Sequence, residues 1–210
     1  GDDRVIDAMF EQKGVIRVSD LDELIETVIL FANSFRPNGD GVAITSTSGG
    51  EVGLYADLGG EIGVHFSEFQ EDTNQKLKGI LPEFGSLGNP LDTTGNAGLD
   101  KELYQSCLNA IAEDENIDLI AVSQMDITES ALKYNKASQI IIESIQECYK
   151  KYKKPILLFT PNSGGTDKNV ASMLMEKGIP LLIGAAPAFK AIRNWLHYFS
   201  SSRQLEKKLS

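Results

Sequence analysis

The chain has few cysteines, no long apolar run and no excess of basic residues. Its two cysteines, Cys107 and Cys148, fall in helical patterns, which favours reduced thiols over a disulfide framework. No apolar stretch reaches the roughly 20 residues that a membrane span needs. The start Gly1–Asp3 is acidic, whereas a signal peptide begins with basic and then apolar residues. We therefore expect a cytoplasmic protein with no membrane partner.

The charge balance argues against a nucleic-acid partner. The 210 residues carry a net charge of −10, whereas a protein that binds DNA or RNA normally has a basic face. The lysines at 150–154 and 207–208 fit the ends of helices, where cations suit the helix dipole. An anionic ligand is still compatible with this charge, because the N–H groups at a helix start bind anions whatever the net charge.

Residues that usually carry out catalysis or hold metals are scarce. No cluster of cysteine and histidine has metal-ligand spacing, and no GxSxG motif is present. His65 has no carboxylate partner nearby in the sequence, and His197 lies in a helical pattern typical of a packed or surface histidine. We predict no metal site and no catalytic residue within this chain.

Apolar runs alternate with helical patterns from residue 42 onwards. The runs at Val42, Ile117 and Ile156 are continuously apolar, as in strands that are buried on both faces of a parallel sheet. We therefore predict a doubly wound α/β fold: a flavodoxin-like parallel five-stranded sheet in the order 2-1-3-4-5, with helices on both faces. Strands are predicted at 42–45, 62–66, 117–123, 156–160 and 181–183, and helices at 51–59, 70–81, 100–112, 130–152, 167–177 and 188–199.

Three segments are predicted along the chain. Residues 1–40 form amino-terminal linking helices and a short strand, 41–200 form the flavodoxin-like domain, and 201–210 form a tail. Within the first segment, we expect a helix at 2–12, a strand at 14–18, and a second helix that Ser19 caps and that runs to about Phe35.

The loop after the first strand is a candidate phosphate site. Ligands in such folds bind beyond the carboxyl ends of the strands, near the point where the strand order reverses. Thr47, Ser48, Gly49 and Gly50 follow the first strand, and they offer hydroxyl groups and closely approachable backbone N–H groups at a helix start. No lysine follows these glycines, so the loop is not a P-loop. The plainer interpretation, a tight helix cap, is equally open.

Three further loops are predicted at the same edge of the sheet. Asn89, Asp92 and Thr93 lie in the second loop, although these residue types also form rigid turns. Ser123 and Gln124 follow the central strand, where simple helix capping is the alternative. Residues 160–166 form the last loop, which either binds a ligand or only turns the chain.

Several short motifs resemble, in the same order, those of the NDP-forming (ADP-forming) acyl-CoA synthetase family, which is related to succinyl-CoA synthetase. In that family an SHTG loop carries a phosphorylated histidine, and a helix and a GVIRV segment follow. Gly1–Phe10 looks like the end of that loop and its helix. The other matches are GVIRV at 14–18, LDEL at 21–24, VAITSTSGG at 42–50, GNPLDTTG at 88–95, KPIL at 154–157 and GIP at 178–180.

The resemblance implies the carboxy-terminal flavodoxin-like CoA-ligase domain of such an acid–thiol ligase. It implies an accessory domain that lines the phosphohistidine/acyl-CoA site, with the histidine upstream, so that the isolated chain is inactive. This chain alone would bind no cofactor, whereas the intact enzyme would use CoA, ADP or ATP, and Mg²⁺. The implied partners are CoA-binding and ATP-grasp domains on the same or a partner chain, and a small-molecule acyl-CoA; a homo-oligomer is also allowed.

Two adjacent positions depart from the family pattern. Glu51 and Val52 follow the glycines where the family commonly has Pro or Phe and then Gly. An acid in the first turn of a helix suits the dipole but repels an incoming phosphate. The alternative function is a non-catalytic ligand-sensing or interaction module of a CoA-linked protein acetyltransferase. The upstream histidine and an ATP-grasp domain would distinguish the enzyme from the module.

Overall fold

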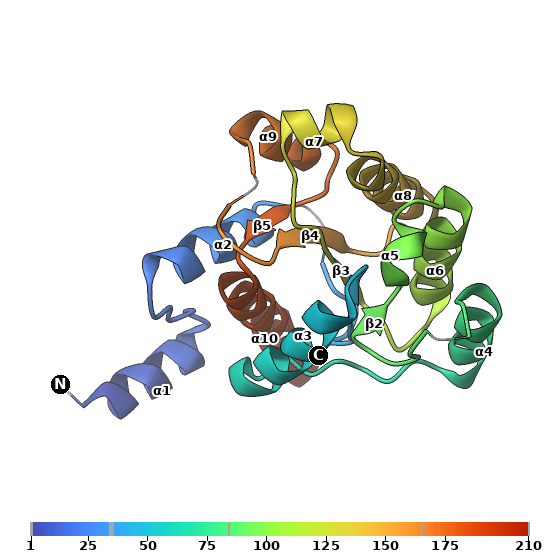
Figure 1. Cartoon of the computed structure of the whole chain (residues 1–210). Helices are drawn as coiled ribbons and strands as arrows, with labels where there is room; N and C mark the ends of the chain where they lie inside the picture. Colours follow the sequence, from blue (N-terminus) through green and yellow to red (C-terminus); the bar gives the residue numbers. More distant parts are fainter. Residues whose placement is uncertain (1, 34–35, 84, 165, 210) are drawn as a thin grey trace.

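Five parallel strands form a single sheet in the order β2-β1-β3-β4-β5, which confirms the predicted class and strand order (Figure 1). The computed structural model describes residues 2–33, 36–83, 85–164 and 166–209. The strands are β1 (Val42–Ser46), β2 (Leu91–Asp92), β3 (Leu119–Ser123), β4 (Ile156–Thr160) and β5 (Leu181–Ile183). Every residue of β1, β3 and β4 is buried, as their continuous apolar runs predict.

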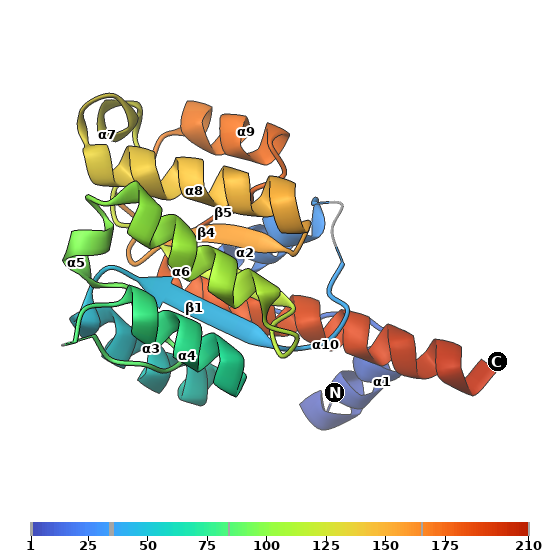
Figure 2. The same ribbon diagram turned by 90° about the vertical axis from the view of Figure 1, so that its right-hand side faces the viewer.

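Helices cover both faces of this sheet (Figures 1 and 2). One face packs mainly aliphatic side chains against α4, α6, α8 and α9, and the other packs aromatic side chains against α2, α3 and α10. On the aromatic side, Phe159 of β4 contacts Tyr55 and Phe189 with ring centroids 5.1 and 5.6 Å apart. The helices are α1 (Asp3–Lys13), α2 (Leu21–Phe31), α3 (Gly49–Ile62), α4 (Glu71–Ile80), α5 (Thr94–Ala97), α6 (Lys101–Glu113), α7 (Glu129–Tyr134), α8 (Lys136–Tyr152), α9 (Lys168–Glu176) and α10 (Ala185–Leu209).

The predicted strand at 62–66 is wrong. Ile62 ends α3, and Phe66 makes only an isolated bridge with Val42. The edge strand is instead the two-residue β2, which lies inside the predicted loop 88–95 and pairs with Thr45 and Ser46. Its place in the sheet is set by that pairing and not by any apolar run of its own.

Beyond β2, the side chain of Asn89 makes hydrogen bonds to the backbone of β1 that a longer edge strand would otherwise make. Its Oδ1 accepts from the N–H of Ile44 at 3.0 Å, and its Nδ2 donates to the carbonyls of Val42 at 2.6 Å and Ser67 at 2.8 Å. The amide thus satisfies buried backbone groups beyond the reach of the two-residue strand.

Three other local predictions also need correction. The helix predicted at 130–152 is two helices, because Asn135 starts α8 by accepting from the N–H groups of Ala137 and Ser138. Residues 14–18 form no strand. Asp20, not Ser19, caps α2, and α2 ends at Phe31; the predicted end near Phe35 lies outside the described residues.

Two buried carboxylates hold α2 on the domain. Glu23 is 1% exposed, and its Oε1 accepts from Arg193 at 3.0 Å and Asn194 at 2.9 Å, both in α10. Glu26 is also buried, and its Oε2 accepts from the N–H of Ile183 in β5 at 3.0 Å. The α2 helix is therefore joined both to α10 and to the β5 edge of the sheet.

In the part of the chain that the structure covers, no helix is long and apolar enough to cross a membrane.

Candidate functional site

The loops after β1 and β2 meet at the carboxyl edge of the sheet. The N–H and Oγ1 of Thr93 both donate to the carbonyl of Ser46, at 2.9 and 3.0 Å. Asp92 lies so close to Gly49 that a Cβ on Gly49 would be 2.8 Å from its Oδ2. Only glycine therefore fits at residue 49 without displacing Asp92, and the structure brings Gly49, Asp92 and Thr93 together.

The start of α3 presents backbone N–H groups at this edge. Ser48 is the N-cap residue, and its side chain makes no capping hydrogen bond. Its own N–H donates inward to the Oγ of Ser46 at 3.1 Å. Gly49 and Gly50 are exposed, and their N–H groups in the first helical turn have no acceptor within the helix. At this helix start, the N–H groups of Gly49 and Gly50 are therefore placed to meet a ligand, whereas that of Ser48 is used within the loop.

Glu51 points inward, onto the ends of two strands. Its Oε2 accepts hydrogen bonds from Ser46 Oγ at 2.7 Å, Ser123 Oγ at 2.9 Å and Tyr55 OH at 3.1 Å. Tyr55 OH and Ser123 Oγ are also 2.7 Å apart. Burial raises the pKa of Tyr55, so its phenol stays protonated and can donate. Ser123 is thus linked to Ser46, at the end of β1, through their shared acceptor Glu51.

Two participants in this network, Ser46 and Tyr55, were not predicted. Tyr55 lies four residues after Glu51, which places the two on one face of α3. That spacing is a signal that sequence reasoning could have used. Ser46 ends an apolar strand with a hydroxyl, which by itself suggests only the end of the strand.

The other predicted residues take different places. Asn89 is occupied by backbone groups at Val42 and Ile44, away from the start of α3. Gln124 donates from Nε2 to Ser138 Oγ at 3.0 Å, and the capping residue in this loop is Thr128, whose Oγ1 accepts from the N–H of Ala131 at the start of α7. Thr47 is half-buried, and its methyl group lies 3.7 Å from the position of a Cβ on Gly98.

The loops after β1 and β2 together are called the loop cluster below. Thr94 lies next to it and combines two unusual features. Its φ of 68° lies in the left-handed region, which β-branched residues rarely adopt. Its buried Oγ1 has no hydrogen-bond partner in the structure. The N–H of Thr94 donates to Asp92 Oδ1 at 2.8 Å, so this conformation helps to fix the carboxylate that faces Gly49.

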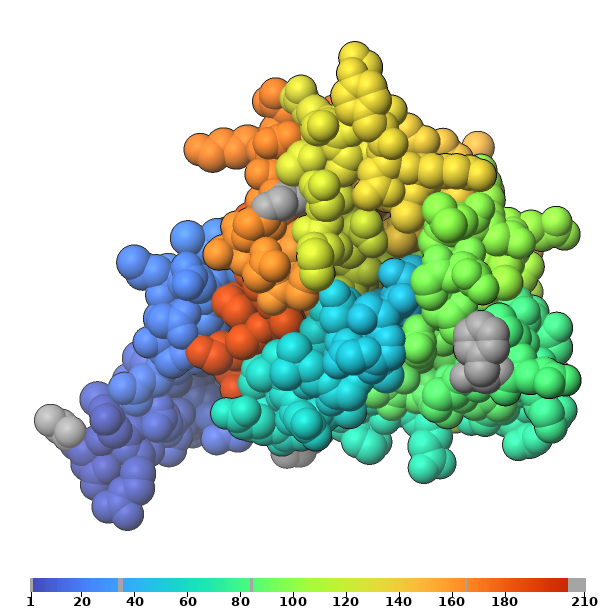
Figure 3. Space-filling model, viewed as in Figure 1, coloured from blue at the N-terminus to red at the C-terminus, as the bar shows by residue number. Residues whose placement is uncertain are grey.

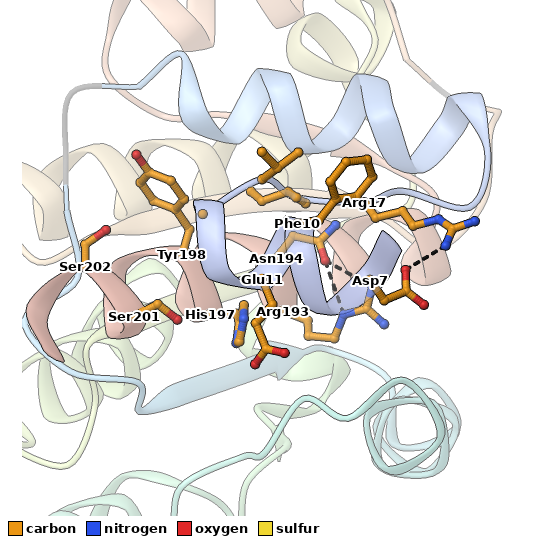
Figure 4. Close-up of a pocket in the computed structure, with 13 residues that line it drawn as sticks. Asp7, Phe10, Glu11, Arg17, Arg193, Asn194, His197, Tyr198, Ser201 and Ser202 are labelled. Atoms are coloured by element: carbon orange, nitrogen blue, oxygen red, sulfur yellow. Dashed lines mark hydrogen bonds and ion pairs between the residues drawn. The ribbon is translucent and has the colours of Figure 1, made fainter. Parts of the chain in front are cut away.

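A cavity of about 410 Å³ lies at a different place, between α1, the segment after it and α10 (Figure 4). Its wall includes Arg17, which is paired with Asp7 at 2.6 Å, and Arg193, which is held by Asn194 and Glu23. In Figure 2, α1 lies toward the end of the molecule away from the carboxyl ends of the strands. This cavity is therefore separate from the loop cluster.

Metal ligands do not converge at either place. Within the described ranges, no group of at least three His, Cys, Asp or Glu residues is arranged to hold a metal ion. The loop cluster instead offers backbone N–H groups, hydroxyl groups and the carboxylates of Asp92 and Glu51.

Comparisons with known proteins relate the chain to ligases. No family model matches it. It is 31% identical over 195 residues to the ADP-forming acetate–CoA ligase I subunit alpha of Pyrococcus furiosus, covering 91% of this chain and 40% of that subunit. It is 29% identical over 184 residues to the ADP-forming acetate–CoA ligase II of Archaeoglobus fulgidus, covering 86% of this chain and 26% of that protein.

A solved structure supports the same fold. The dinucleotide-forming acetyl-coenzyme A synthetase 1 of Ca. Korarchaeum cryptofilum, in its apo form, superposes with a TM-score of 0.77 at 19% identity. The match covers 100% of this chain and 44% of that one. The chain thus spans less than half the length of each of these proteins.

Proposed function

Because the chain belongs to the NDP-forming acyl-CoA synthetase family and has the flavodoxin-like fold of its CoA-ligase domain, we propose that it is an accessory domain of an ADP-forming acyl-CoA synthetase. In the reaction that we infer, phosphate attacks an acyl-CoA to give an acyl phosphate and free CoA. The phosphoryl group then passes through a histidine to ADP, and the sequence is reversible. We place the loop cluster in the wall of the phosphohistidine/acyl-CoA site.

The close approach of Asp92 to Gly49 is the observation that carries this proposal. It brings the second loop against the first and leaves the N–H groups of Gly49 and Gly50 at an exposed helix start. Preorganised N–H donors in such a place stabilise the charge that develops on a phosphoryl group in transfer. Neither loop contains a histidine, so the domain would orient and stabilise the group while the phosphorylated histidine lies elsewhere.

The partners follow from the length of the relatives and from an exposed apolar surface. The chain spans 40% and 26% of two ligases, so we propose that CoA-binding and ATP-grasp domains complete the enzyme, with CoA, ADP or ATP and Mg²⁺ as its ligands. The outer side of α2 exposes a stripe of apolar side chains that would pack on such a domain or on a second copy. Its members are Leu21, Leu24, Ile25 and Val28.

Replacing Gly49 with valine in the longer enzyme tests the proposal. The added Cβ would displace Asp92 and block the approach to the helix start, so phosphorylation of the histidine should slow about 100-fold. Rapid-quench labelling from acyl-CoA and phosphate measures this rate in a single turnover. Gly53→Val is the matched control, because a Cβ on Gly53, in the same helix, has no neighbour within 4 Å.

Equal labelling rates in the two variants, with both folded, would contradict a role for this loop. The alternative role as a ligand-sensing module is favoured by the inward carboxylate of Glu51, which places a negative charge at the same helix start as the N–H groups of Gly49 and Gly50. For that module, the longer protein would lack the histidine and no label would appear in the wild type.

A further inference from the structure

The carboxylate of Glu51 occupies the place where a flavodoxin-like sheet binds its ligand. In the order β2-β1-β3, the chain leaves β1 to one side and returns as β3 on the other, so the switch point lies between the carboxyl ends of β1 and β3. Ser46 ends β1 and Ser123 ends β3. Both hydroxyl groups donate to Glu51 Oε2, at 2.7 and 2.9 Å. The carboxylate therefore joins the two strand ends across the switch point.

The surroundings of this oxygen have the chemistry of an anion site. Ser46, Tyr55 and Ser123 come from three different elements, and each is at most 2% exposed. Their hydroxyl groups converge on one negatively charged oxygen, and hydrogen bonds to an ionised acceptor are stronger than those between neutral groups. None of the contacts described for this oxygen is to lysine or arginine, so neutral donors hold the charge.

We propose that the switch point between β1 and β3 is an anion site whose occupant is the chain's own Glu51 carboxylate. The tethered carboxylate excludes free phosphate and small carboxylates, since a second anion beside a partly buried negative charge is repelled. The inference builds on the proposed function, because it restricts how a ligand can approach the N–H groups of Gly49 and Gly50. A phosphoryl group would reach Gly49 and Gly50 only from outside, brought by a partner domain.

A purely structural tie would show the same hydrogen bonds but would behave differently when Glu51 is removed. If the switch point is an anion site, Glu51→Ala leaves three hydroxyl donors around a space that a small carboxylate can fill. Added formate should then take the place of the lost group. A purely structural carboxylate stabilises the fold because it is part of α3 and holds that helix on the strand ends. A free ion cannot do this, so formate would not restore the lost stability.

The experiment measures the melting temperature of the 210-residue chain against formate concentration, with sodium chloride matching the ionic strength. Without formate, Glu51→Ala should melt about 5 °C below the wild type. Formate should recover at least half of this loss with saturation, while leaving the wild type unchanged. Glu61→Ala is the matched control, because Glu61 is exposed in the last turn of the same helix.

Two results would overturn the proposal. Formate or inorganic phosphate could stabilise the wild type as much as the variant, which would mean that the Glu51 carboxylate does not exclude free anions from this site. Alternatively, a folded Glu51→Ala could show no more response to formate than Glu61→Ala, which would reduce the network to a structural tie.

If Glu51→Ala does not fold, Glu51→Gln keeps the shape of the side chain and removes its charge. Titration with inorganic phosphate, followed through the amide resonances of Gly49 and Gly50, should give binding at least tenfold tighter than in the wild type. Equal affinities would overturn the proposal. These measurements use the isolated chain, whereas histidine labelling in the longer enzyme tests the proposed function, so each can fail while the other holds.

Discussion

The helices α1 and α2 have the same length and similar starts, yet only α2 is anchored. Each has 11 residues, and an aspartate caps each one, Asp2 for α1 and Asp20 for α2. The α1 helix buries no residue, and its clearest link is the exposed pairing of Arg17 with its aspartates. The α2 helix buries Glu23 and Glu26 against α10 and β5. Capping and amphipathicity form both helices, but buried polar contacts fix only one of them to the domain.

The largest expected effect that would test this comparison comes from Glu23→Ala. The change removes the buried carboxylate that accepts from Arg193 and Asn194, and the loss of hydrogen bonds to a buried charged acceptor costs about 3 kcal/mol. Urea unfolding measures the loss of free energy. Asp22→Ala, next to it on the exposed side of α2, should stay within about 0.5 kcal/mol of the wild type. A loss no larger than that in Glu23→Ala would show that packing alone anchors α2.

The second effect depends on pH and comes from Glu26→Gln. Burial raises the pKa of Glu26 from 4.5 to about 7. The folded state therefore favours the protonated carboxyl, so the stability that it contributes is complete below pH 4.5 and is lost as pH rises through about 7. Glutamine stays uncharged and can still accept from Ile183. Between pH 5 and pH 8, the variant should gain about 2 kcal/mol relative to the wild type.

Urea unfolding at several pH values measures this difference, with Glu61→Gln as an exposed control that should show no such trend. A constant offset between Glu26→Gln and the wild type across the pH range would contradict the assignment of this titration to Glu26. It would also weaken the comparison, because one of the two carboxylates would then behave like a surface group.

Removal of residues 1–13 should have the smallest effect. This deletion takes away α1 and the aspartates that pair with Arg17, and exposed ion pairs contribute about 1 kcal/mol or less. The unfolding free energy should change by no more than that amount. A loss of unfolding free energy as large as that of Glu23→Ala would contradict the comparison, since it would mean that residues 1–13 stabilise the domain as strongly as the anchored α2 does.

Sequence alone predicted the centre of the sheet well because burial there is total. The runs that became β1, β3 and β4 are apolar at nearly every position, and this pattern requires no knowledge of distant contacts. The edge strand was missed for the opposite reason. Leu91–Asp92 is too short to show a period, and its pairing with Thr45 and Ser46 is a tertiary fact. The run at 62–66 is interrupted by Gly63, whose φ of 86° ends α3.

The candidate site was predicted at the level of loops but not of side-chain direction. The closeness of Gly49 to Asp92 follows from the pairing of β2 with the end of β1, and sequence indicated only that the two loops lie at the same edge of the sheet. The spacing of Glu51 and Tyr55 could have indicated one shared helix face, but the contact of Glu51 with Ser123, 72 positions away, follows no local pattern. Whether Thr47, Asn89, Thr93 or Gln124 contacts a ligand stays a prediction.

Both edges of the sheet are blunted against unwanted strand pairing. On one side β2 is only two residues long, and on the other the Glu26 carboxylate takes the N–H of Ile183 that an added strand would need. Conditions that loosen α2, such as the loss of Glu23, would uncover β5 as a template for other chains. The cost of such a lesion would then be aggregation at high concentration, and its rate would depend on the number of chains present.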